Sequence, residues 1–150
     1  MAYIKYKEIT KYFNFSRAVD KKNLPKYIKD YVFDDEKILA AYKTLTDHGV
    51  FSDKKVVLFD SFGFKRQIYM IPYKSVSTCS IIFSRSGAEL LLYLDCGYPV
   101  RLKFVNMTDV DKLRLRVLYS TVIRIVNDQK LNSDDVNRLV EDEFSFNDKK

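Results

Sequence analysis

The sequence is poor in the residues on which most metal and redox sites depend. Its 150 residues include one histidine and two cysteines, whereas a zinc site needs about four clustered ligands. Cys79 and Cys96 lie seventeen positions apart, and we expect both to pack in or beside strands as small apolar side chains. The sequence therefore predicts no metal and no cofactor.

Recognisable catalytic motifs are also absent. The single imidazole, His48, lies in a predicted turn over residues 47–49, and no serine sits in a nucleophile-elbow motif. The sequence has no glycine-rich phosphate loop and no dinucleotide fingerprint. The acidic runs at residues 34–36 and 141–143 are typical of solvated charges. We predict that the chain is not an enzyme and has no small-molecule substrate.

Long hydrophobic runs are missing as well. The longest apolar stretches, such as residues 90–94, fall far short of the roughly 20 residues that a membrane-spanning helix requires. Residues 1–11 place lysine and glutamate among apolar positions, unlike a secretory signal. We expect no transmembrane segment and a cytoplasmic chain whose cysteines are reduced.

The residues that are present predict a β-rich domain. The composition is 47% hydrophobic and 31% charged, which is typical of one soluble domain with its own core. Seven runs rich in β-branched and aromatic residues predict consecutive strands, at residues 38–45, 49–52, 55–59, 66–71, 75–83, 88–94 and 98–105. Glycines between apolar runs predict hairpin corners, at Gly49, Gly63, Gly87 and Gly97.

Helical periodicity follows the last strand. Thr108 and Asp111 have the spacing of a capping box, and apolar residues then recur every three or four positions between Leu115 and Val126. This amphipathic helix needs a surface to cover, and the open end of the preceding sheets is the nearest one. Shorter helices are predicted near residues 24–32 and 133–140.

Two segments resemble the bacterial pleckstrin-homology-like (PH-like) domain family. Residues 49–60 read GVFSDKKVVLFD and residues 71–76 read IPYKSV, similar to the family's GxFTDKRLIFxD and IPYKSI segments. With the terminal helix, the resemblance covers residues 34–127. It implies a mainly β (α+β) fold, in which a PH-like barrel of two roughly orthogonal antiparallel sheets, with seven strands, is capped by the C-terminal helix and carries short helical additions at both ends. It also implies frequent oligomeric assembly and no established reaction.

Charge is unevenly distributed along the chain. Residues 1–33 hold eight basic and three acidic residues, whereas residues 131–150 hold three basic and six acidic ones. We therefore divide the chain into a basic aromatic N-terminal extension at 1–33, a PH-like domain at 34–127 and an acidic C-terminal extension at 128–150.

The predicted function is a non-enzymatic interaction module that binds protein partners and self-associates. Aromatic residues provide large contact areas at interfaces, and the N-terminal arm supplies the candidate interface residues Tyr6, Tyr12, Phe13 and Phe15. The alternative for these residues is that the arm packs across its own domain.

Binding of nucleic acid or of an anionic membrane is the competing function. A net charge of +6 favours polyanions, and lysines interleaved with aromatics are compatible with phosphate contacts and base stacking. The candidate anion-binding residues are Lys5, Lys7 and Lys11 in the arm and Lys54, Lys55, Lys65, Arg66 and Lys74 near hairpin ends.

Overall fold

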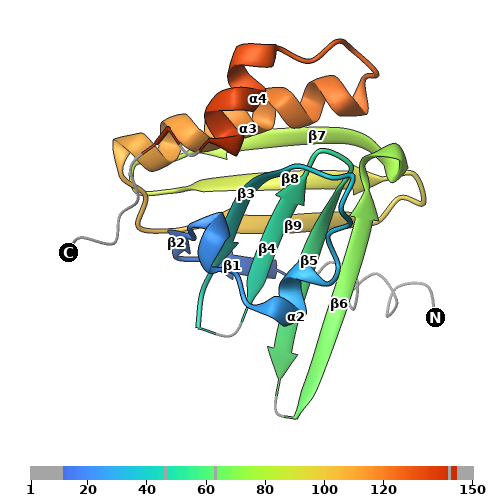
Figure 1. The fold of residues 1–150 in the computed structure, drawn as a ribbon, viewed down its shortest axis with the longest axis vertical. Coiled ribbons are helices and arrows are strands. Elements are labelled where there is room, and N and C mark those ends of the chain that lie inside the picture. Colours follow the sequence, from blue (N-terminus) through green and yellow to red (C-terminus); the bar gives the residue numbers. More distant parts are fainter. Residues whose placement is uncertain (1–11, 46, 63, 142, 145–150) are drawn as a thin grey trace.

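Two β-sheets packed face to face form the body of the structure, a computed structural model that describes residues 12–45, 47–62, 64–141 and 143–144. The strands of one sheet run across those of the other (Figure 1). The four-stranded sheet has the order β1 (Tyr12–Phe15), β9 (Pro99–Phe104), β8 (Ala88–Leu94), β7 (Val76–Phe83). The five-stranded sheet has the order β2 (Arg17–Ala18), β3 (Ile38–Lys43), β4 (His48–Ser52), β5 (Lys55–Phe62), β6 (Lys65–Pro72).

All seven strands predicted from the sequence are present, as β3 to β9. Side chains alternate across each strand, so that Leu90 and Leu92 of β8 face the core while Tyr93 is exposed. Among the described strands no ladder joins β6 to β7. The two sheets are therefore an open PH-like sandwich and do not close into a continuous barrel.

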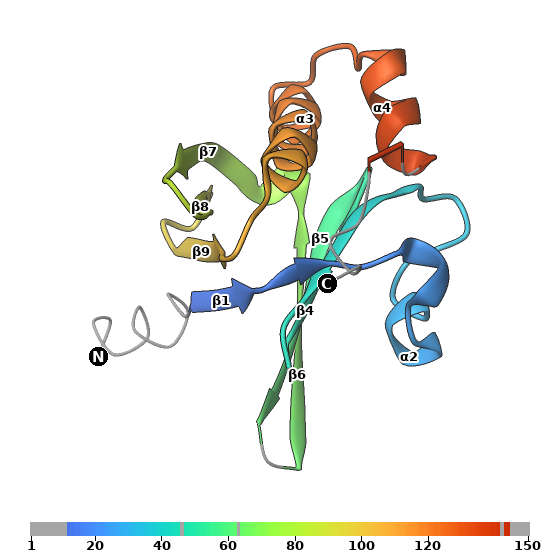
Figure 2. The ribbon, with the colours of Figure 1, turned by 90° about the vertical axis from the view of Figure 1, so that its left-hand side faces the viewer.

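Two short strands, β1 and β2, were not predicted from the sequence. β1 pairs in parallel with β9, and β2 pairs antiparallel with β3. Only Ser16 separates them, so one short segment crosses from one sheet to the other (Figure 2). The four-stranded sheet is consequently mixed, and strands of both sheets lie in the segment that the sequence assigned to an N-terminal extension.

The predicted amphipathic helix is α3 (Asp109–Val126), and its capping box is confirmed. The Thr108 hydroxyl accepts a hydrogen bond from the Asp111 N–H at 3.1 Å, while the Asp111 carboxylate accepts one from the Thr108 N–H at 3.0 Å. The helix lies across one end of the two sheets (Figures 1 and 2). Its apolar face completes the main core, whose fully buried members include Phe51, Leu58, Leu92, Leu102, Leu115 and Leu118.

A second, smaller core lies on the outer face of the five-stranded sheet. The 3-10 helix η1 (Lys21–Asn23) and the helix α2 (Lys26–Lys29) precede β3. Leu24 and Ile28 pack there against Val50, Val57 and Phe59. This segment therefore covers a sheet face that would otherwise expose a row of large apolar side chains to water.

The C-terminal helix α4 (Ser133–Val140) packs against α3 and β3. The side chain of Asn132 caps it by accepting a hydrogen bond from the Asp135 N–H at 3.1 Å. The Lys21 ammonium donates to the carbonyl of Leu139 at 2.7 Å. Segments from the two ends of the chain thus meet beside β3, and both predicted short helices are present.

The prediction that Gly49 forms a hairpin corner is wrong, because Gly49 lies within β4. A short 3-10 helix, η2 (Tyr73–Ser75), forms the corner between β6 and β7. In the described part of the chain, no helix is long and apolar enough to cross a membrane.

Candidate interaction surfaces

Phe13 and Phe15 are core residues, which corrects their assignment to an exposed interface. Their side chains are 2% and 1% exposed. Phe13 makes an edge contact with Tyr69 at a ring-centroid distance of 5.6 Å, and Phe15 packs on Tyr42 and Phe104. Both point inward because β1 is a sheet strand whose alternate residues face the core. Their large apolar surfaces therefore stabilise the chain's own fold.

The remaining arm candidates lie mostly outside the described residues. Tyr6, Lys5, Lys7 and Lys11 precede the first described residue, Tyr12, whose backbone begins β1. The interface role of Tyr6 and the anion-binding role of the three lysines therefore stay predictions.

The structure separates the basic candidates of the domain into two groups. Lys65 and Arg66 begin β6, whereas Lys54 and Lys74 lie beyond its other end, where the Tyr73 N–H donates to the Lys54 carbonyl at 3.1 Å. The strand between them has eight residues, which is about 25 Å at the usual rise per residue. All four side chains are exposed, but they do not form one anion site.

Lys55 is not available as a surface cation. Its ammonium lies 3.2 Å from a carboxylate oxygen of Glu36, and the two side chains are 7% and 5% exposed. The Phe33 ring covers the same ammonium, with its centroid 3.8 Å away. This buried ion pair fastens the segment before β3 to the start of β5, so we assign Lys55 a structural role.

His48 begins β4 with its side chain half-buried. Its pKa is lowered, first because burial disfavours the charged imidazolium and then by the positive charge of Lys43. Asp47 opposes this effect, and Arg66 adds to it. Positive charges therefore gather at the end of the sheet where the β3–β4 and β5–β6 hairpins turn.

The two cysteines are free thiols, Cys79 buried and Cys96 exposed. Burial raises the pKa of the Cys79 thiol, which makes it a poor nucleophile. Within the described ranges, no group of three or more histidine, cysteine and acidic side chains could hold a metal ion.

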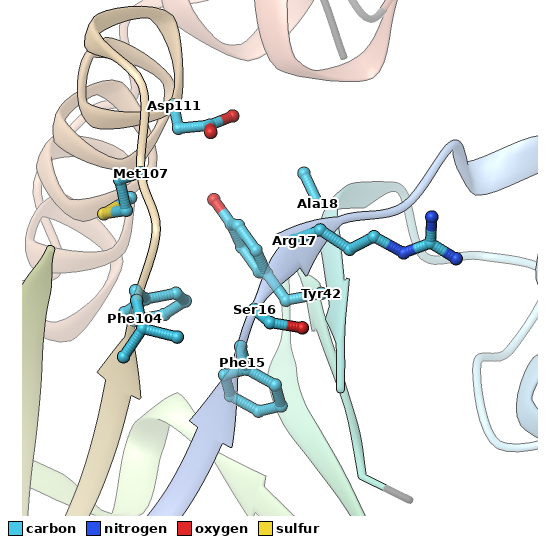
Figure 3. A pocket seen from close by; sticks show the side chains of 9 residues that line it. Phe15, Ser16, Arg17, Ala18, Tyr42, Phe104, Met107 and Asp111 are labelled. Atoms are coloured by element: carbon cyan, nitrogen blue, oxygen red, sulfur yellow. The ribbon is translucent and has the colours of Figure 1, made fainter. Parts of the chain in front are cut away.

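A buried polar cluster joins β3 to the start of α3 (Figure 3). The Tyr42 hydroxyl points toward Asp111, whose carboxylate accepts a hydrogen bond from Arg114 at 3.0 Å. Burial raises the pKa of Tyr42 far above its usual range; the charge of Arg114 acts against this shift and that of Asp111 adds to it. The adjoining cavity measures about 10 Å³, which is at most the space for one water molecule. We therefore read this cluster as structural. Nothing in the apolar sequence around Tyr42 signals it.

An apolar groove lies between the two sheets, along β6. Its volume is about 330 Å³, or roughly ten times the volume that one water occupies in the liquid. The residues that line it are all apolar or aromatic: Phe13, Leu58, Ile68, Tyr69, Met70, Ile71, Leu94, Tyr98 and Val100. We call this site the β6 groove. Sequence reasoning missed it because its walls come from five different strands and a loop.

The outer face of the four-stranded sheet is the second unassigned surface. Ile82 is 65% exposed and Tyr93 is 41% exposed. By alternation and register, Leu91 and Pro99 lie on the same face, next to the ion pair between Arg101 and Glu89. No described element packs across this face (Figure 2), unlike the outer face of the other sheet, which α2 covers.

Two crossed sheets with one C-terminal helix across their end define a pleckstrin-homology fold. The model of the bacterial PH domain family matches residues 9–126, so the chain belongs to the bacterial PH domain family. The resemblance seen in the sequence is confirmed, and the match begins before β1.

Solved structures agree with this assignment. A DUF1696-family protein with a pleckstrin-homology domain from Shewanella loihica has a TM-score of 0.61 at 21% identity, covering 76% of this chain and 98% of that one. A pleckstrin homology domain from Shewanella amazonensis has a TM-score of 0.53 at 25% identity, with 72% and 89% covered. A PH-domain-containing protein from Exiguobacterium sibiricum has a TM-score of 0.58 at 21% identity, with 75% and 62% covered. No curated protein matches the chain.

Proposed function

We propose that this bacterial PH domain is a non-catalytic interaction module that self-associates and binds protein partners. One observation carries the proposal: α2 covers the outer face of the five-stranded sheet, whereas no described element covers the outer face of the four-stranded sheet, where large apolar side chains are exposed. Exposed apolar patches with polar surroundings are characteristic of protein interfaces. Ile82, Leu91, Tyr93 and Pro99 are the large apolar residues of this face, and they lie among polar residues that include the ion pair between Arg101 and Glu89.

Self-association through this face is tested by light scattering after size-exclusion chromatography, at low and high salt. An apolar interface persists in high salt, because screening acts on charges. We expect a multimer that Ile82→Glu converts to monomer, because the substitution would bury a charge in the interface. Val110→Glu is the matched control, since Val110 is a similarly apolar, 38% exposed residue on α3.

Deleting residues 1–11 distinguishes an interface formed by the N-terminal arm from one formed by the outer face of the four-stranded sheet. This deletion spares β1, whose Phe13 and Phe15 belong to the core. A multimer lost on this deletion but retained by Ile82→Glu would move the interface to the arm. A monomer under all conditions would overturn self-association.

Polyanion binding is the second candidate function, supported by the positive charges of Lys43 and Arg66 acting on His48. Retention on heparin and binding to labelled nucleic acid or anionic vesicles would then fall steeply with salt. We expect Lys65→Glu to weaken this binding, whereas Lys54→Glu, at the other end of β6, serves as the control. An affinity that changes neither with added salt nor with Lys65→Glu would contradict this candidate function.

A further inference from the structure

We infer that β6 and the β6 groove form a docking site for an extended peptide that adds a strand to the five-stranded sheet. The peptide would place alternate apolar side chains in the groove and acidic residues beside Lys65 and Arg66. This inference deepens the proposed protein-binding function, on a surface separate from the one proposed for self-association.

β6 is an edge strand. In the part of the chain that the structure describes, β6 pairs with β5 only. Antiparallel pairing leaves every second residue of an edge strand with its N–H and C=O directed away from the neighbouring strand. Half of the eight residues of β6 therefore present a row of backbone hydrogen-bonding groups to an incoming strand.

The other sheet edges are less suitable. α3 engages the edge of β7, where the Tyr119 hydroxyl donates to the Cys79 carbonyl at 3.0 Å. β1 has four residues and β2 has two, which is too short to hold a peptide of useful length. β6 is the long edge that remains among the described strands.

The position of the groove also favours docking along β6. Tyr69 and Ile71 of β6 line it together with Leu94 and Tyr98, which lie across from them in the other sheet and its β8–β9 loop. A strand bound along β6 would direct every second side chain to this side of the sheet. Main-chain hydrogen bonds would then supply affinity, and the apolar groove would select side chains.

The charge around β6 favours an acidic partner over a second copy of this chain. Lys65 and Arg66 are exposed at the hairpin end of β6. At the other end, Lys54 and Lys74 share the surface with Asp53 and Asp95, so that no strong net charge results. Antiparallel pairing of β6 with another β6 would bring Lys65 and Arg66 toward this mixed end of the second copy, which offers no excess of negative charge. Residues 1–11, with three lysines and one glutamate, also lack the complementary charge.

The experiment uses the full chain and a set of short labelled peptides. Each peptide alternates threonine with one apolar residue (valine, leucine or phenylalanine in different members) and has acidic residues at one end. Fluorescence anisotropy measures affinity, and amide chemical shifts in NMR spectra locate the site. We expect saturable binding that shifts the amides of β6 and leaves those of β7 and β1 unchanged.

N-methylation of the peptide backbone tests strand addition directly. Methylating the alternate amides that face β6 should abolish binding, while methylating the other set should leave it intact, because only one set donates to the edge. Equal tolerance of both sets would overturn strand addition. Replacing the acidic residues with lysines should weaken binding and reverse its salt dependence, because salt screens the new repulsion from Lys65 and Arg66.

Variants of the groove complete the test. Leu94→Lys and Tyr98→Lys should each weaken peptide binding at least about tenfold by placing a charge against apolar side chains. They add positive charge, so the loss would not come from repulsion of an acidic peptide. Val110→Lys is the matched control, because Val110 is an exposed apolar residue of α3 that lines neither the β6 groove nor the face proposed for self-association. Circular dichroism and light scattering confirm folding and association state for each variant.

The outcomes separate this inference from the proposed function. No binding by any peptide, or shifts centred on β7 or β1, would overturn the docking site and leave self-association through Ile82 intact. Binding of a fluorescent fatty acid in the groove without peptide binding would assign it to a small apolar ligand instead. A monomeric chain that binds the peptides would support the docking site and overturn self-association.

Discussion

The ring of Phe15 fills the space where a side chain of Gly49 would lie. A Cβ atom built on Gly49 is 2.6 Å from Cζ of Phe15. Gly49 lies within β4 and Phe15 ends β1, which pairs with the other sheet. This contact therefore ties the short crossing segment to the interior of the five-stranded sheet.

Gly49→Ala should destabilise the fold by about 1–3 kcal/mol, the usual cost of overpacking a core. The Phe15 ring cannot move aside easily, because it is 1% exposed and packs on Tyr42 and Phe104. Urea denaturation measures the loss. Adding Phe15→Leu to Gly49→Ala should recover part of it, and strictly additive effects of the two substitutions would contradict the contact.

The sequence predicted the strands and helices that have strong local signals. Alternating apolar residues mark β9, and the capping box at Thr108 marks the start of α3. The family resemblance added the arrangement of the two sheets, which local patterns alone do not provide.

The missed features depend on contacts between distant residues. β1 and β2 are too short to have a periodic signal, and their strands form because β9 and β3 offer open edges. Similarly, Lys55 reads as an ordinary surface lysine in the sequence, and only the positions of Glu36 and Phe33 bury it. The β6 groove likewise exists only once the two sheets are packed together.

Removing either partner of the buried ion pair between Lys55 and Glu36 should lower the free energy of unfolding. Lys55→Met leaves the Glu36 carboxylate buried without its cation, and we expect a loss of about 3 kcal/mol in the free energy of unfolding. Adding Glu36→Gln should restore much of this stability, because no uncompensated charge remains. Denaturant titration of the two single variants and the double variant gives the coupling energy, and a value near zero would show that the pair is not important for stability.

Replacing Tyr42 and Tyr73 with phenylalanine should change the stability of the fold in opposite directions. The buried Tyr42 hydroxyl has no hydrogen-bond partner among the described residues, whereas the Tyr73 hydroxyl donates to the Ser52 carbonyl at 2.8 Å. Tyr42→Phe should therefore stabilise the fold by about 1 kcal/mol, and Tyr73→Phe should destabilise it by about the same amount. Thermal unfolding of both variants tests this, and a clear loss of stability in Tyr42→Phe would contradict the first expectation.

Alkaline pH should destabilise the fold through the same tyrosines. Burial raises the pKa of both Tyr42 and Tyr73 in the folded state, whereas an unfolded tyrosine ionises near pH 10. Their contribution is therefore fully present below about pH 10 and is lost as pH rises above it, by up to about 1.4 kcal/mol per pH unit for each tyrosine. The measurement is urea denaturation between pH 8 and about pH 11.5. Lysines also titrate in this range, so the test compares wild type with Tyr42→Phe. The free energy of unfolding of Tyr42→Phe should fall less steeply with pH. Parallel curves for the two proteins would contradict the raised pKa of Tyr42.

Acidic pH should act through His48. Its pKa is lowered in the folded state, first by burial and then by Lys43, while an unfolded histidine titrates near pH 6.5. The unfolded chain therefore binds the proton more readily, and the stability that neutral His48 provides is present above about pH 6.5 and is lost as pH falls below it. Thermal unfolding from pH 7.5 to pH 5 should show a decrease in melting temperature that is smaller in His48→Gln. Lys43→Gln offers an independent check, because removing this positive charge should raise the pKa of His48. NMR titration of the imidazole measures that pKa directly. An unchanged pKa would exclude Lys43 as a cause of the shift.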